Sequence, residues 1–187
     1  MARLTAIYDA CVLYPAPLRD FLMQLALTDL FRAKWTNRIH DEWTRNLLKN
    51  RPDLKKEQLE KTRRLMNAAT RDCLVEGYDG LIESVKLPDE DDRHVLAAAI
   101  HSRANVIVTF NLKDFPSKLL RQHKIEALHP DEFIARLIDL DSATVAQAAQ
   151  QHRARLRNPP KTVDEYLLTL ANQGLVKTVE YLKKSAL

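Results

Sequence analysis

Residues 92–110 read DRHVLAAAIHSRANVIVTF, and this stretch decides the fold. Acids precede an apolar segment that has the length of a helix, and the β-branched run Val106–Val108 follows it. An uninterrupted apolar run of this kind is typical of a strand that is buried on both faces of a parallel sheet. Acids at the start of the segment favour a helix that begins among residues 89–92, because they lie at the positive end of the helix dipole.

The same alternation of strands and helices continues on both sides of this stretch. We expect further strands at residues 4–8, 34–36 and 125–128. Helical spacing of apolar residues predicts helices at residues 18–31, 37–49, from 52–53 onward, and from Pro130 to Leu140, with Asn37 as the N-cap of the second. Strands that alternate with helices predict an open, mostly parallel sheet with helices on both faces, which is an α/β fold.

No strand pattern follows residue 140. A helix is expected at residues 142–157, a second begins after a capping box formed by Thr162 and Glu165, and a third covers residues 175–182. We therefore divide the chain into an α/β domain at residues 1–140 and a helical extension at residues 141–187.

Length and composition exclude several classes of protein. The chain has 187 residues, 45% of them hydrophobic, which is enough for one ordinary domain with an appendage. It has no apolar stretch near the roughly 18 residues of a membrane helix, and its N-terminus lacks the apolar block of a signal peptide, so we expect a cytoplasmic protein. Two cysteines exclude a disulfide framework, and three glycines exclude the glycine-rich phosphate loops.

The net charge of +4 is unevenly distributed. Residues 32–71 hold twelve Lys and Arg against five Asp and Glu, whereas residues 89–92 are four consecutive acids. A basic surface near an acidic cluster suits an enzyme that acts on a polyanion with divalent metal ions. The alternative is a solvated helical hairpin whose charges only maintain solubility.

Several carboxylates are predicted to meet at one edge of the sheet. Asp9 follows the first strand, Asp114 follows the strand at 106–110, and the acids of 89–92 begin a helix on that side. Glu42 lies on a helix of the basic segment, from which it could reach the same place. Such carboxylates cannot all stay ionised without a cation, so the cluster predicts Mg²⁺ or Mn²⁺.

Each acid also has an ordinary structural interpretation. Asp9 and Asp114 could be turn residues, Glu42 a surface charge, and two of the acids at 89–92 helix-capping groups. His94 and His101 are better explained as packed or surface histidines than as ligands, since no other metal-binding residue type has matching spacing.

Cys11 lies close to Asp9, but a nucleophilic thiol needs a base, and the sequence offers none.

Four segments together resemble the PIN-domain family, the ribonuclease fold of VapC toxins in bacterial toxin–antitoxin pairs. They are IYDACVLYP at 7–15, LPDEDDRHVLAAAI at 87–100, VIVTFNLKDFP at 106–116 and HPDEFI at 129–134. The resemblance covers about residues 4–139. It implies a PIN-like sheet and hydrolysis of RNA phosphodiester bonds with Mg²⁺ or Mn²⁺.

The resemblance also implies roles for particular residues. The acidic quartet of the family would be Asp9, Glu42, Asp92 and Asp114, with Asp9, Asp92 and Asp114 as metal ligands. Thr109 and Asn111 look like the polar residues that line the site and bind substrate. Asp89 is the next candidate for the third acid and Asn111 the alternative position for the fourth. Ala10 and Cys11 depart from the family, which often has a hydroxyl residue and then Asn or Ser here.

The expected partners follow from the same resemblance. They are an RNA substrate and a cognate antitoxin protein, which would insert an amphipathic helix or a basic side chain into the acidic pocket. The last two helices would present apolar faces to this partner or to a second copy of the chain, and residues 141–187 look like the C-terminal domain of a longer VapC-like subgroup.

Two other classes of protein remain open at this point. One is a catalytically silent PIN-like module that binds RNA or protein. The other is a phosphoacceptor domain, which needs a second acid beside the first, a position where this chain has Ala10 and Cys11.

Overall fold

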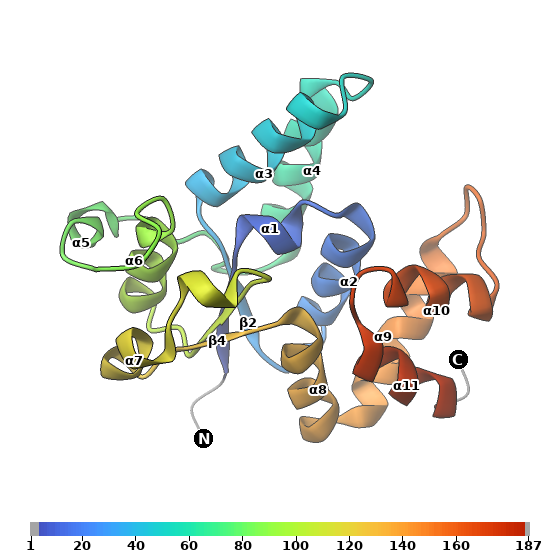
Figure 1. Cartoon of the computed structure of the whole chain (residues 1–187). Helices are drawn as coiled ribbons and strands as arrows, with labels where there is room; N and C mark the ends of the chain where they lie inside the picture. The colour runs from blue at the N-terminus through green and yellow to red at the C-terminus, as the bar shows by residue number, and fades with distance from the viewer. Residues whose placement is uncertain (1–3, 186–187) are drawn as a thin grey trace.

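The computed structural model of the protein describes residues 4–185, which form a parallel sheet surrounded by helices (Figure 1). The strands are β1 (Thr5–Tyr8), β2 (Arg32–Lys34), β3 (Val106–Val108) and β4 (Glu126–Leu128). Their order is β2-β1-β3-β4, and every neighbouring pair is parallel. The predicted α/β fold is confirmed.

The two central strands are the most apolar segments of the sheet. Every residue of β1 and β3 is buried, whereas the edge strands β2 and β4 each have an exposed residue. Ile7 pairs with Ile107 and Tyr8 with Val108, so both strands end at the same level. This register brings the residues that follow them to one edge of the sheet.

The helices before residue 141 connect the strands and cover the sheet. They are α1 (Ala10–Leu13), α2 (Ala16–Ala26), α3 (Asn37–Asn50), α4 (Lys56–Ala69), α5 (Asp79–Ile82), α6 (Arg93–His101), α7 (Ser117–Leu120) and α8 (Pro130–Leu140). Short 3-10 turns cover Leu112–Asp114 (η1) and Arg121–His123 (η2). Helices α3 and α4 form a hairpin that projects from the body of the molecule (Figure 1).

An aromatic cluster lies under the central strand. Tyr8 is fully buried, and its ring centroid is 6.2 Å from those of Phe31 and Trp35 and 6.3 Å from that of Phe133. Aromatic pairs at this spacing add to the free energy gained from burial. The cluster therefore fixes β1, and with it the residue that follows, against β2 and α8.

The structure corrects the predicted boundaries in the first half of the chain. The helix expected at 18–31 ends at Ala26, because Asp29 has a φ of 62° and turns the chain into β2. The strand expected at 34–36 lies at Arg32–Lys34, while Trp35 forms an isolated bridge with Leu74.

Two helices also begin elsewhere than predicted. The N-cap of α3 is Thr36, whose hydroxyl accepts a bond from the Ile39 N–H at 3.0 Å, and not Asn37. The long charged helix begins at Lys56, since residues 52–54 form a turn.

Three further helices form the C-terminal part, namely α9 (Ser142–Arg155), α10 (Val163–Ala171) and α11 (Val176–Lys184). The predicted capping box of Thr162 and Glu165 is present at the start of α10. Helix α9 packs on α2, where the His152 ring stacks on Phe21 with centroids 5.7 Å apart. These helices thus share a core with the first part of the chain, and a division at residue 140 stays a prediction.

Helix α11 is tied to α8 through a buried carboxylate. Asp131, which is 6% exposed, accepts hydrogen bonds from the Thr178 N–H and hydroxyl and from the Lys177 N–H at 2.7–2.9 Å. Among residues 4–185, no helix is long and apolar enough to cross a membrane.

Candidate active site

Asp9 lies at the carboxyl end of β1 and is 3% exposed. Its N–H donates to the Val108 carbonyl at 3.1 Å, which ties it to the end of β3. Its carboxylate accepts bonds from the Ala10 N–H at 2.6 Å, the Thr109 hydroxyl at 2.7 Å and the Cys11 thiol at 3.2 Å. Burial nevertheless raises the pKa of Asp9, because these hydrogen bonds offset only part of the lost hydration.

The residues that follow β3 form the opposite side of this site. Thr109 is fully buried, and its hydroxyl donates to Asp9 and accepts a bond from the Asn111 N–H at 2.9 Å. Asn111 itself is exposed, and its carbonyl accepts a bond from the N–H of Asp114 in η1 at 3.0 Å. Thr109 therefore positions Asp9, whereas Asn111 and Asp114 lie where a substrate could reach them.

Asp92 precedes α6, and its side chain is not used to cap that helix by any bond within residues 4–185. Its neighbours have structural roles instead: Asp89 accepts a bond from the Asp91 N–H at 2.9 Å, and Glu90 pairs with Arg93 at 2.5 Å. The interpretation of this run as partly structural is thus supported for Asp89 and Glu90. The carboxylate of Asp92 is left to face the site.

The electrostatics of Asp92 show which acids come together. Its pKa is raised to about 7, first by burial and then by the negative charges of Asp9, Asp89, Asp114 and Glu42. The charge of Glu42 also raises the pKa of Asp9. The structure therefore brings the four predicted acids near one another from four separate segments, and Asp89 lies within reach of the same cluster.

Glu42 lies on α3 and contacts a buried residue for which the sequence predicts no role in the site. The side chain of His94 is 1% exposed, and its Nε2 lies 2.8 Å from Glu42 Oε1, close in distance although not a well-formed hydrogen bond. Arg38 Nε approaches the same oxygen at 3.8 Å. His94 is packed, as expected, and its ring lies against the carboxylate of Glu42. No spacing in the sequence predicts this contact, because it depends on how α3 and α6 pack together.

Cys11 is a second contact that sequence reasoning did not assign. Its sulfur accepts a bond from the Phe110 N–H at 3.3 Å while the thiol donates to Asp9. Burial and the charge of Asp9 raise the pKa of Cys11 to about 12. The thiol is therefore protonated at neutral pH and serves as a hydrogen-bond donor rather than a nucleophile.

The residues present fit a hard divalent cation. Carboxylate oxygens are the donors that Mg²⁺ and Mn²⁺ prefer, and a cation would relieve the repulsion that raises the pKa of Asp92. Within the described residues, no three His, Cys, Asp or Glu side chains are already close enough to hold an ion together.

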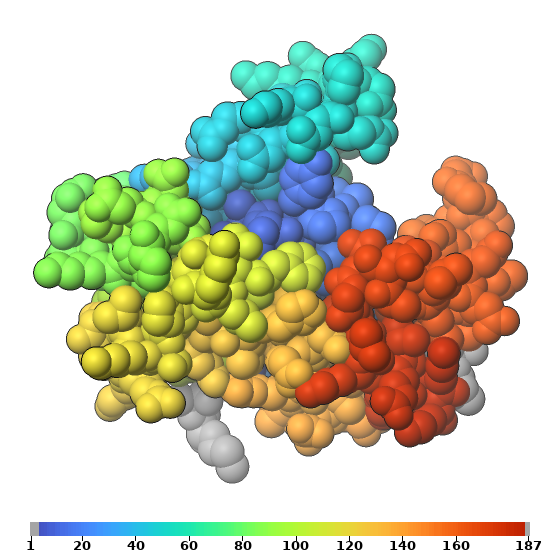
Figure 2. Space-filling model, viewed as in Figure 1, coloured from blue at the N-terminus to red at the C-terminus, as the bar shows by residue number. Residues whose placement is uncertain are grey.

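A pocket of about 480 Å³ opens beside the cluster, between α3 and the segment that leads into α6. Glu42 and Asp92 are in its wall, together with Arg38, Arg45 and Asn46. In the space-filling view, the hairpin, the green segment before α6 and the yellow segment after β3 surround a recess with blue N-terminal residues at its floor (Figure 2).

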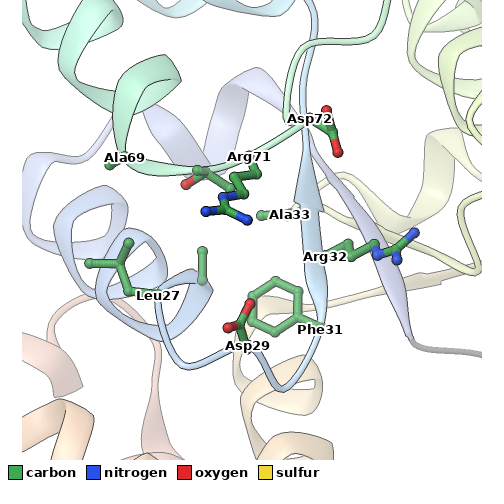
Figure 3. A pocket seen from close by; sticks show the side chains of 10 residues that line it. Leu27, Asp29, Phe31, Arg32, Ala33, Ala69, Arg71 and Asp72 are labelled. Carbon is green, nitrogen blue, oxygen red and sulfur yellow. The ribbon is translucent and has the colours of Figure 1, made fainter.

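A larger pocket, of about 580 Å³, lies away from these acids at the amino end of β2. Arg71 points into it, and Phe31 and Asp29 form its lower wall (Figure 3). None of the four predicted acids lines it, so its size does not make it the active site.

Comparisons with known proteins identify the family of the chain. A family model described as "PIN domain" matches residues 5–113, and one described as "VapC50 C-terminal domain" matches residues 130–184. A protein of Mycobacterium tuberculosis (strain ATCC 25618 / H37Rv) named "Putative ribonuclease VapC50" is 44% identical over 98 residues. That alignment covers 52% of this chain and 57% of the relative, so the chain spans little more than half of the relative's length. No solved structure matches.

Proposed function

The chain belongs to the PIN domain family, and on that premise we propose that it is a Mg²⁺- or Mn²⁺-dependent ribonuclease that hydrolyses RNA phosphodiester bonds. The M. tuberculosis relative, whose name describes a ribonuclease, supports this activity. In this proposal Asp9, Asp92 and Asp114 hold the metal, and Glu42 completes the catalytic acids.

The observation that carries the proposal is the placement of Asp9, Asp92 and Asp114 after β1, before α6 and after β3, where other carboxylates raise the pKa of Asp92 to about 7. Like charges gathered at one edge of a sheet destabilise the fold unless they serve a ligand. A bound divalent cation would attract each of these carboxylates and so offset the repulsion between them. Such a cation would also offset the repulsion between the acids and the anionic phosphodiester at the bond that is cleaved.

The chain's own residues orient the site. Thr109 and the Ala10 N–H fix the two oxygens of Asp9, and the buried ring of His94 lies against Glu42. What a bound divalent ion supplies is Lewis-acid stabilisation of the negative charge that builds up on the phosphate oxygens. Because the thiol of Cys11 stays protonated, we assign the cleavage to attack by water and not to a covalent enzyme intermediate.

We further propose that the protein is the toxin of a type II toxin–antitoxin pair. The match of residues 130–184 to the VapC50 C-terminal domain supports a VapC-like toxin of the longer form. The partner would be an antitoxin that places a basic side chain among the acids of the site. Co-expression with the small protein encoded beside this gene should yield a stable complex with suppressed ribonuclease activity. Failure of every neighbouring product to bind would remove the pairing and leave the nuclease proposal intact.

The ribonuclease proposal is tested by replacing the two acids that interact most directly. Asp9→Asn and Asp92→Asn should each lower the rate of cleavage of single-stranded RNA by roughly 100-fold or more, which corresponds to several kcal/mol of transition-state stabilisation. The matched control is Asp164→Asn, an exposed acid in the first turn of α10. Circular dichroism should show all three variants folded. Full activity in both site variants would overturn the proposal.

A catalytically silent PIN-like module that binds RNA or protein is the second candidate. The observation in its favour is that no three ligands within residues 4–185 are already positioned for a metal. Calorimetric titration with Mn²⁺ separates the two functions. A nuclease should bind the ion with an affinity that Asp92→Asn lowers, whereas a silent module should show no binding that depends on Asp92.

A further inference from the structure

The pocket beside Glu42 and Asp92 has a basic wall that the catalytic proposal does not use. Arg38 and Arg45 are seven residues apart on α3, which is about two helical turns, so they project from one face of the helix with Glu42 between them. The opposite face of α3 is anchored in the core by Ile39 and Trp43, both fully buried. The helix therefore presents this basic wall to the pocket in a fixed orientation.

These two guanidinium groups make few interactions with the described residues of the protein. Arg45 is exposed and has no hydrogen bond or ion pair within residues 4–185. Arg38 makes a single long contact, 3.8 Å to Glu42. The other acid in this wall, Asp41, is already paired with Arg63 at 2.8 Å. Both arginines can thus bind an external anion without breaking a strong internal pair.

The surroundings indicate which anion fits. The pocket volume of about 480 Å³ is in the range of sites for small molecules, roughly 300–1,000 Å³, and its lining is mostly polar and charged. The segment before α6 contributes Asp91 and Asp92 to the pocket, whereas α3 contributes Glu42 and two arginines. The planar guanidinium groups of these arginines can bind phosphate oxygens through two parallel hydrogen bonds. A nucleotide next to the one under attack would lie here.

We propose that this pocket binds the phosphate and sugar of the nucleotide next to the cleaved bond, with Arg38 and Arg45 holding the phosphate and Asn46 beside it as a hydrogen-bonding group. The inference rests on the proposed ribonuclease function and narrows the contact with RNA. It assigns RNA binding to the base of the α3–α4 hairpin, next to the acids, rather than to the whole basic segment of residues 32–71. The far end of the hairpin projects away from the body (Figure 1).

Binding of a fluorescent single-stranded RNA, measured by anisotropy in EDTA so that no cleavage occurs, tests the assignment. Arg45→Gln should weaken binding about tenfold, the effect of losing one charge-assisted hydrogen-bonding group. It should also reduce the slope of log affinity against log salt by about 0.7, the value for one phosphate contact on a single strand. Arg45→Lys, which keeps the charge, should recover most of that slope.

The matched control is Arg64→Gln, an exposed arginine on α4 that does not line this pocket, and it should change affinity less than twofold. The double variant Arg38→Gln/Arg45→Gln should lower the slope further. An unchanged slope in the double variant, or an equal loss in Arg64→Gln, would overturn the proposal. Because the assay involves no cleavage, its outcome is independent of the Asp9→Asn and Asp92→Asn test, and either proposal can fail alone.

Discussion

Two buried aspartates, Asp9 and Asp131, show how the same side chain serves different ends in this molecule. Both are almost fully buried, and each accepts three hydrogen bonds. The donors of Asp131 come from the start of α11, so its bonds join two helices that are far apart in the sequence. Asp9 instead lies in the field of Glu42 and next to Asp92. A buried carboxylate that has only hydrogen-bond donors around it, such as Asp131, has a structural role. A buried carboxylate with other negative charges nearby, such as Asp9, is a candidate for catalysis.

The two sites also act on stability in opposite directions. The bonds to Asp131 satisfy buried donors that would otherwise lack partners. The acids around Asp92 repel one another, as its raised pKa shows, so they destabilise the folded chain whenever all are ionised. Three further experiments test this difference between Asp131 and the acids around Asp92.

Removing the Asp131 carboxylate should have the largest effect on stability. Asp131→Ala leaves the Thr178 hydroxyl and two N–H groups at the start of α11 without acceptors, and we expect a loss of about 3 kcal/mol in the free energy of unfolding. Urea unfolding followed by circular dichroism measures it. Asp139→Ala, an exposed acid on the same helix α8, is the control and should change the free energy by less than about 0.5 kcal/mol. Similar losses in both variants would contradict a structural role for Asp131.

The acidic cluster should make stability depend on pH. The pKa of Asp92 is about 7 in the folded chain against an ordinary value of 3.8, so the folded state binds more protons between these limits. Stability from this group is therefore greatest at low pH and is lost as the pH rises through about 7. In metal-free buffer at pH 8, Asp92→Asn should raise the Tm by a few degrees.

The same difference in Tm between Asp92→Asn and the wild type should shrink as the pH falls and vanish well below pH 3.8, where the wild-type carboxyl is protonated in both the folded and the unfolded state. Millimolar Mg²⁺ or Mn²⁺ at pH 8 should raise the Tm of the wild type more than that of the variant. Scanning fluorimetry across pH values gives both results. A Tm difference that does not vary with pH would show that the acids do not interact.

A pair of threonines gives the smallest and most closely matched test. Thr109 and Thr178 are both fully buried, and each donates its hydroxyl to a buried aspartate at 2.7 Å. Thr178→Val should lower the free energy of unfolding by about 1 kcal/mol and leave RNA cleavage unchanged. Thr109→Val should lower the cleavage rate several-fold, because Asp9 loses the bond that orients it. Equal effects of the two variants on cleavage would show that Asp9 and Asp131 are not functionally different.

Local signals explain which parts of the fold the sequence predicts correctly. Pro130 marks the start of α8, and Thr162 with Glu165 marks the start of α10, because proline geometry and capping bonds depend only on nearby residues. The end of α2 is missed because Leu30 and Phe31 continue the apolar spacing of the helix. Phe31 in fact belongs to the aromatic cluster beneath β1, a tertiary contact that a periodic pattern does not reveal.

The candidate site is predictable to the extent that it depends on topology. Parallel strands bring the residues after β1 and β3 to one edge, which accounts for Asp9 and Asp114. Glu42 is harder to place, since it reaches the cluster from a helix whose orientation is set by packing. The contact of His94 with Glu42 and that of Cys11 with Phe110 depend on how α6 and the two strand ends meet, so no spacing in the sequence predicts them.

The stacking of His152 on Phe21 has a practical consequence for anyone who wishes to isolate the part of this chain that matches the PIN domain. Cutting after residue 140 would remove α9 from α2 and expose Phe21, a side chain that is now completely covered. A truncated protein of that kind would have an exposed apolar surface and would be expected to aggregate. On this expectation, work on residues 1–140 needs the last three helices to be present, because they cover part of the interior.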